Sequence, residues 1–186
     1  PGFTLPKLLW IREHEPEVWS RVAVLLLPKD YIRFRLTGTL ATDVADAAGT
    51  LLFDVDRRDW SPAACNLFDI DPAILPPALE SAGVAGHVTP FAADAMGLAE
   101  GTPVAAGSGD NQCGAIGAGV VEPNLILATL GTSGVVYAHA LKPWRDLPDH
   151  ASPACGGGGT RGSASVREGA APPPGRVHTM CAADGS

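Results

Sequence analysis

Residues 103–140, PVAAGSGDNQCGAIGAGVVEPNLILATLGTSGVVYAHA, carry the clearest signal of the fold class. A small apolar strand is predicted over 103–107, followed by a tight turn at 108–111 and a helix of small residues over 112–120. A hairpin of two strands is predicted over 124–140, because leucine and β-branched residues flank a glycine-rich turn. Strands that alternate with a helix in this way favour an α/β architecture.

Proline and glycine mark several helices before this stretch. A helix needs no N–H at its first position, so Pro16 and Pro28 each predict a helix start. Gly38 predicts the end of the second of these helices. Shorter elements are also predicted: a helix over 7–13, a strand over 50–55, and helices that begin at the pairs Ser61-Pro62 and Asp71-Pro72.

The composition restricts the classes of protein. The chain has 186 residues and a formal net charge of −7, which argues against nucleic acid as a partner because phosphate binding requires clustered Lys and Arg. It contains no apolar run of 18 residues, so no membrane span is expected. The four cysteines form no CxxC pair and the five histidines no HxxxH pair, so neither a disulfide scaffold nor a metal site is predicted. The reducing cytoplasm is the expected location, and the oligomeric state stays open, a homodimer included.

Asp110 is the leading candidate for chemistry. It follows a predicted strand, is flanked by Gly109 and Asn111, and opens a predicted helix. A carboxylate fixed in this way can accept the proton of an alcohol that attacks a phosphoryl group. The alternative from spacing alone is that Asp110 only caps the helix, since Asp is a preferred cap residue.

The turn Gly131-Thr132-Ser133-Gly134 is the second candidate. Backbone N–H groups of a glycine turn, with two hydroxyl groups beside them, can hold phosphate oxygens. It is not a Walker loop, because no Gly-Lys-Ser/Thr sequence follows. The alternative is an ordinary hairpin turn.

Other polar residues receive structural interpretations. Thr42-Asp43 is expected to start a helical turn, with Asp43 and Asp46 solvated rather than paired at a site. The basic residues Lys29, Arg33 and Arg35 are expected to form a solvated helix face. Cys113 lies among small apolar residues and is expected to be a core thiol.

The segment from Ala151 to Gly175 differs from the rest of the chain. It contains seven Gly and four Pro, and Val166 is its only large aliphatic residue. Such a segment buries too little apolar surface to offset its ordering entropy, so disorder is predicted, and an inserted or frame-shifted stretch is one interpretation. Ordered sequence is expected to resume at Arg176.

Several motifs together resemble the FGGY family of carbohydrate kinases. GFTLPKLLWIRE (2–13) is similar to the first family signature, and LPKDY (27–31), LTG (36–38) and TDVADAAGT (42–50) are most similar to the members that phosphorylate xylulose. GSGDN (107–111) resembles the family's Gly-Gly-Gly-Asp-Asn segment, and LGTSG (130–134) resembles a turn that contacts phosphate.

The resemblance implies an actin-like (ribonuclease H-like) fold of two domains that close over ATP and a sugar. It implies transfer of the γ-phosphoryl group of MgATP to the 5-hydroxyl of D-xylulose. Asp110 would be the general base and would bind the sugar with Asn111. Gly131, Thr132 and Ser133 would lie against the nucleotide phosphates, while the Mg²⁺ ligands would lie mostly outside this chain. No metal ligand is assigned within it.

The resemblance also implies an internal fragment. Residues 1–122 would be the later part of the N-terminal domain, 123–149 the start of the C-terminal domain, 150–175 an insert and 176–186 resumed C-terminal sequence. The family's Asp-x-Gly-Thr hairpin and Met-His-Gly segment have no counterpart here, so the chain alone is expected to be inactive. The alternatives are another FGGY kinase, acting on glycerol, ribulose or gluconate, or a non-catalytic actin-like remnant.

Overall fold

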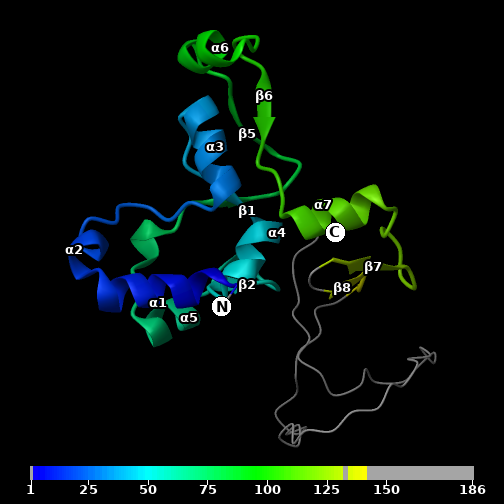
Figure 1. The fold of residues 1–186 in the computed structure, drawn as a ribbon, viewed down its shortest axis with the longest axis horizontal. Coiled ribbons are helices and arrows are strands. Elements are labelled where there is room, and N and C mark those ends of the chain that lie inside the picture. The colour runs from blue at the N-terminus through cyan, green and yellow to red at the C-terminus, as the bar shows by residue number, and fades with distance from the viewer. Residues whose placement is uncertain (1, 132–133, 142–186) are drawn as a thin grey trace, which may run out of the picture. The chain divides into compact units, whose positions relative to one another are not determined.

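The computed structural model describes residues 2–131 and 134–141. All of these residues belong to one compact unit. The described residues form seven α-helices, two short 3-10 helices and four two-stranded sheets (Figure 1). The predicted α/β class is therefore confirmed.

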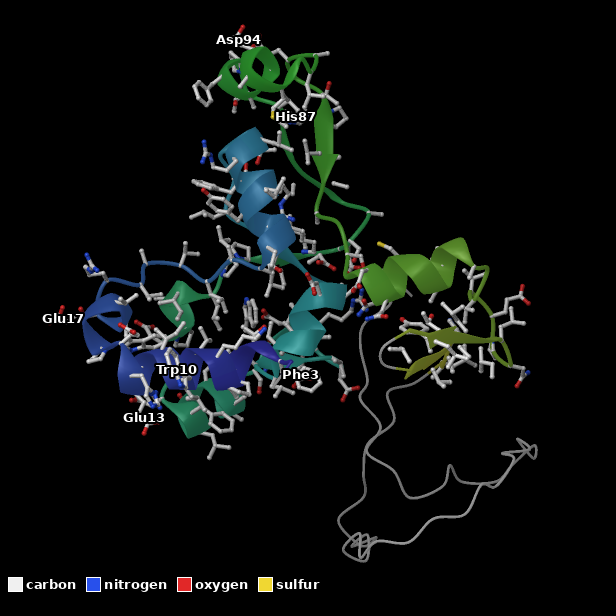
Figure 2. The ribbon with its side chains drawn as sticks, in the orientation of Figure 1. Phe3, Trp10, Glu13, Glu17, His87 and Asp94 are labelled. Atoms are coloured by element: carbon white, nitrogen blue, oxygen red, sulfur yellow. The ribbon has the colours of Figure 1, made fainter. Side chains whose placement is uncertain are left out.

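The first helices begin and end where proline and glycine predict. α1 (Thr4–His14) is followed by α2 (Pro16–Trp19), which begins on a proline. α3 (Pro28–Thr37) also begins on a proline and ends at Gly38, whose φ of 72° is a left-handed conformation that glycine adopts without strain. On the exposed side of α1, Trp10 stacks on His14 with ring centroids 4.7 Å apart (Figure 2).

The larger apolar core lies under α1. It consists of seven buried residues drawn from α1, α5 (Pro62–Phe68), the 3-10 helix η2 (Pro72–Ile74) and the segments beside them, namely Leu5, Leu8, Leu52, Cys65, Ile70, Ile74 and Leu75. Ser61 caps α5 through the backbone N–H of Ala64, as the Ser-Pro pair predicts. The Asp71-Pro72 pair starts a single 3-10 turn instead of an α-helix.

The middle of the chain forms two small sheets. β1 (Thr42–Asp43) pairs in parallel with β4 (Ala78–Leu79), and β2 (Phe53–Asp54) pairs antiparallel with β3 (Asp59–Trp60). α4 (Val44–Ala47) and the 3-10 helix η1 (Ala48–Thr50) lie between β1 and β2. The strand predicted over 50–55 is thus mostly wrong, because Thr50 ends η1 and only Phe53 and Asp54 are paired.

The next sheet leads toward the candidate site. β5 (Val84–His87) pairs antiparallel with β6 (Pro103–Ala105), and α6 (Pro90–Met96) lies between them in sequence. Gly86 of β5 lies against α3: an added Cβ would come within 2.8 Å of Thr37 Cβ, so only glycine allows this approach. β6 then delivers the chain to the loop before Asp110.

The helix and the hairpin predicted within residues 103–140 are both present in the structure. α7 spans Asp110–Gly117, two residues earlier at its start and three at its end than the predicted helix. β7 (Ile126–Leu130) and β8 (Gly134–Ala138) form an antiparallel hairpin in which Leu130 faces Gly134. The predictions for Thr132, Ser133 and residues 142–186 lie outside the described residues. No helix in the described part of the chain is long and apolar enough to cross a membrane.

Candidate active site around Asp110

Asp110 is the first residue of α7 and its side chain is exposed. Gly109 is the N-cap residue, with extended φ and ψ of −65° and 153°, so Asp110 does not itself cap the helix. Asn111 Nδ2 donates a long hydrogen bond of 3.5 Å to Asp110 Oδ1. A carboxylate in the first turn of a helix interacts favourably with the helix dipole.

The loop that carries Asp110 is anchored by backbone hydrogen bonds. The N–H of Ala106 donates to the Gly83 carbonyl at 2.8 Å, and the N–H of Gly107 donates to the Ser81 carbonyl at 3.0 Å. Gly107 has a φ of 85° and lies over the side chain of Lys29, since an added Cβ would be 3.5 Å from Lys29 Cδ. The loop therefore rests on the charged start of α3.

Five charged side chains gather beneath this loop, and we call them the Lys29 cluster: Lys29, Asp30, Arg33, Asp43 and Asp46. Lys29 Nζ lies 2.6 Å from Asp30 Oδ1, 2.6 Å from Asp43 Oδ1 and 3.5 Å from Asp46 Oδ2. The side chains of Asp30 and Asp43 are fully buried, whereas that of Asp46 is 31% exposed. Three carboxylates thus share one ammonium group.

Arg33 connects the Lys29 cluster to the loop that leads from β6 to Asp110. Its Nη2 lies 3.0 Å from Asp30 Oδ1, and its guanidinium donates hydrogen bonds to the carbonyls of Ala106 and Ala41. Only 4% of Arg33 is exposed. The predicted solvated helix face is therefore wrong for Lys29 and Arg33 and holds for Arg35 alone, because two of the three cations turn inward to carboxylates and carbonyls.

Asp43 starts α4 as predicted but is buried, not solvated. Its Oδ2 accepts hydrogen bonds from the N–H groups of Ala45 and Asp46, at 2.8 and 3.1 Å, and from Ser81 Oγ at 2.9 Å. Because Oδ1 forms an ion pair with Lys29 at 2.6 Å, the carboxylate has a counter-ion at one oxygen and hydrogen bonds at the other. This is the condition under which a protein tolerates a buried charge.

The surroundings of Lys29 and Asp46 shift their protonation equilibria. Burial by itself would lower the pKa of Lys29, but hydrogen bonds to Asp30 and Asp43 and their negative charges outweigh it and raise the pKa. Burial raises the pKa of Asp46, and the charge of Asp43 adds to this against the opposing pull of Lys29. Lys29 is therefore firmly charged, and the pKa of the Asp46 carboxyl group lies above its ordinary value.

Gln112 is a polar residue of α7 for which the sequence predicted no role in the site. It is 3% exposed, and its Nε2 donates a 3.2 Å hydrogen bond to the Ala45 carbonyl of α4. Cys113, the next residue, is exposed, so its prediction as a core thiol is wrong. The error arises because α7 carries small residues on its exposed side as well, which leaves no apolar stripe to identify the buried face.

The glycine turn is only partly described. Gly131 follows β7 and is exposed, and Gly134 opens β8. The hairpin itself is confirmed. Thr132 and Ser133 lie outside the described residues, so their role against nucleotide phosphates stays a prediction.

Among residues 2–131 and 134–141, no group of three or more His, Cys, Asp or Glu side chains is arranged to hold a metal ion. The acidic residues under the loop are instead paired with Lys29 and Arg33. What the described site can do is present one exposed carboxylate, Asp110, from a firmly anchored loop. That arrangement suits the removal of a proton from a substrate hydroxyl group.

Comparisons with known proteins identify the family of the chain. Residues 1–117 match the FGGY family of carbohydrate kinases, N-terminal domain. The chain is 50% identical over 146 residues to the xylulose kinase of Bacillus subtilis and 47% identical over 138 residues to that of Escherichia coli. These matches cover 78% and 74% of the chain, but 29% and 28% of the relatives.

Solved structures share the fold. The crystal structure of a xyloylose kinase from Brucella ovis superposes with a TM-score of 0.70 at 38% identity, over 74% of this chain and 28% of that one. The ligand-bound xylulose kinase of Lactobacillus acidophilus gives 0.73 at 27% identity, over 79% and 30%. The chain therefore spans less than a third of the length of the proteins that it matches.

Proposed function

The chain belongs to the FGGY family of carbohydrate kinases, and we propose that it forms the sugar-side part of an enzyme that phosphorylates D-xylulose. The proposal draws its substrate from relatives of 46–50% identity that are named xylulose kinases. The observation that carries it is the exposed carboxylate of Asp110 on a loop anchored by the Lys29 cluster. The expected family fold is actin-like.

In the proposed reaction Asp110 accepts the proton of the sugar's 5-hydroxyl group. The hydroxyl oxygen bonds to the γ-phosphorus of ATP, the bond from that phosphorus to the β-phosphate oxygen breaks, and ADP leaves. MgATP supplies the phosphoryl group as co-substrate. Phosphoryl transfer requires little covalent chemistry from the protein, so a rigidly placed proton acceptor is the main contribution of this part of the enzyme.

Asn111 completes the sugar side of the proposed site. Its Nδ2 reaches Asp110 Oδ1 at 3.5 Å, a weak bond that a sugar hydroxyl group can replace. Ser108 Oγ is buried and has no hydrogen-bond partner in the described part of the chain, which leaves another donor beside the base. The turn at Gly131, Thr132 and Ser133 is proposed to face the nucleotide phosphates, because glycine turns present N–H groups to anions.

The proposed organisation places the sugar-side domain in residues 1–122 and the start of the nucleotide-side domain in 123–149. Residues 150–175 are proposed as an insert and 176–186 as resumed sequence of the second domain. A cytoplasmic location and the lack of nucleic-acid partners stay predictions from composition.

A chimera tests the proposed substrate. This chain's 146 matching residues replace the corresponding segment of the Bacillus subtilis xylulose kinase, so that the rest of the kinase is supplied by a relative that is 50% identical over the exchanged part. ADP release is then measured with D-xylulose, ribulose, gluconate and glycerol. The proposal predicts the highest kcat/KM with xylulose. A folded chimera that prefers another of these substrates would refute the proposed specificity.

A further inference from the structure

Gln112 connects the first turn of α7 to α4 from within the protein. Its Nε2 bonds to the carbonyl of Ala45, a residue that is 0% exposed, and Gln112 itself is 3% exposed. The two residues are 67 positions apart in the sequence. The contact therefore fixes the helix that begins with Asp110 against the element that Asp43 caps.

The carbonyl end of the same side chain closes over Gly109, the residue directly before Asp110. A Cβ added to Gly109 would overlap Gln112 Oε1 and come within 3.3 Å of Gln112 Cδ and 3.4 Å of Asp46 Oδ1. Gly109 has a φ of −65°, which any residue can adopt. A methyl group at position 109 would therefore have to displace the Gln112 amide, although the backbone conformation itself accepts any residue.

We propose that Gln112 is a positioning residue that sets the direction of the Asp110 side chain. One end of its amide is tied to α4 and the other fills the space above Gly109, so the turn from Gly109 to Asp110 is held between them. The inference rests on the proposed role of Asp110 as the general base. A misplaced base stabilises the transition state less well, so kcat falls, whereas KM changes little because substrate binding is largely kept.

The contact itself is measurable on this chain without any activity. Gln112 is the only glutamine in the sequence, so selective ¹⁵N labelling of glutamine gives one side-chain NH₂ signal in an NMR spectrum. We expect its hydrogens to exchange with solvent at least about tenfold more slowly than those of a free glutamine side chain, because they are buried and bonded. Exchange at the free rate would overturn the proposal.

The positioning role is measured in the chimera with a double-mutant cycle. Gln112→Ala is expected to lower kcat about tenfold with KM for xylulose within about twofold, at temperatures well below unfolding. Gly109→Ala is expected to lower kcat by at least about as much, because the new methyl group displaces the Gln112 amide. The double variant Gly109→Ala/Gln112→Ala should be no worse than Gln112→Ala alone, since the methyl group then enters vacated space.

Cys113→Ala is the matched control, because this neighbour on the same helix is exposed and the substitution keeps its backbone hydrogen bond to the Gly109 carbonyl. It should leave kcat and KM unchanged. The positioning role would be overturned if the reductions of kcat in the two single variants multiply in the double variant. It would also be overturned if Gln112→Ala lowers thermal stability but leaves kcat normal. If the parent chimera does not phosphorylate xylulose, the proposed function fails, and the exchange rate of the Gln112 amide still decides whether the contact exists.

Discussion

Lys29 Nζ lies 2.6 Å from Asp43 Oδ1, although 14 positions separate these residues in the sequence. Asp43 begins α4, and Lys29 lies in the first turn of α3. The pair is the electrostatic link between the two helices beneath the loop that carries Asp110. The position of the proposed base therefore depends on charges that do not touch it.

Loss of Lys29 should destabilise the fold strongly. In Lys29→Met, Asp30 retains Arg33 at 3.0 Å, but Asp43 loses its counter-ion while its side chain is fully buried. Removing one partner of a buried ion pair typically costs about 3–5 kcal/mol. The free energy of unfolding, measured by urea titration, should fall by about that amount.

The double variant Lys29→Met/Asp43→Asn separates this cause from lost packing. A neutral Asn at position 43 removes the unpaired charge, so at least about 1 kcal/mol should be regained relative to Lys29→Met. If the double variant is less stable than Lys29→Met, the charge pair is not what the lysine contributes.

Asp46 should make stability fall as pH rises. Burial raises its native pKa above the ordinary value of 3.8. Between these two pKa values the native state binds more protons than the unfolded state, so ionisation favours unfolding. Asp46→Asn cannot ionise. Its free energy of unfolding relative to the parent protein should therefore increase as the pH is raised from below 3.8 toward neutrality.

Glu80 supplies a comparison of opposite sign. The hydrogen bonds from Arg58 lower its pKa below 4.5, so its stabilising effect is present above 4.5 and is lost as the pH falls through the native pKa. Glu80→Gln should thus lose stability relative to the parent as pH rises. Relative-stability curves of equal slope for the two variants would contradict the assigned causes.

Two glycine substitutions should have opposite effects. An added Cβ meets no atom within 4 Å at Gly38 or Gly114, so only the backbone conformation distinguishes them. Gly38→Ala places alanine at a φ of 72° and should cost about 1 kcal/mol. Gly114→Ala lies within α7 and should gain up to about 1 kcal/mol from helix propensity. Thermal unfolding of both variants measures the difference, and a shift of the same sign would contradict it.

Local signals in the sequence predicted where helices begin and end, but not which charged side chains are buried and paired. Pro28 and Gly38 bound α3 because proline and glycine act through their own backbone conformations. Lys29 was predicted to be a surface residue because its partner Asp43 lies on another element, 14 positions away. The periodicity of a sequence does not indicate such a pairing. A buried charge is identified only when the fold shows its counter-ion.

In the candidate site, too, some residues could be predicted from the sequence and others could not. Asp110 and its helix could be predicted because a carboxylate beside a glycine follows a predicted strand. The burial of Gln112 could not be predicted, because a single glutamine in a helix is usually exposed. Its burial depends on a carbonyl 67 residues away. Cys113 was misassigned for the matching reason: small residues cover both faces of α7.

The role of Asp110 as the general base is tested by the initial rate of xylulose phosphorylation in the chimera that carries Asp110→Asn. Asn keeps the shape of the side chain and cannot accept the proton, so kcat should fall by about 10²-fold or more with the fold intact. Asp94→Asn, an exposed substitution on α6 (Figure 2), should retain the parent rate. An Asp110→Asn chimera that turns over xylulose at the parent rate would contradict the assignment of Asp110 as the general base.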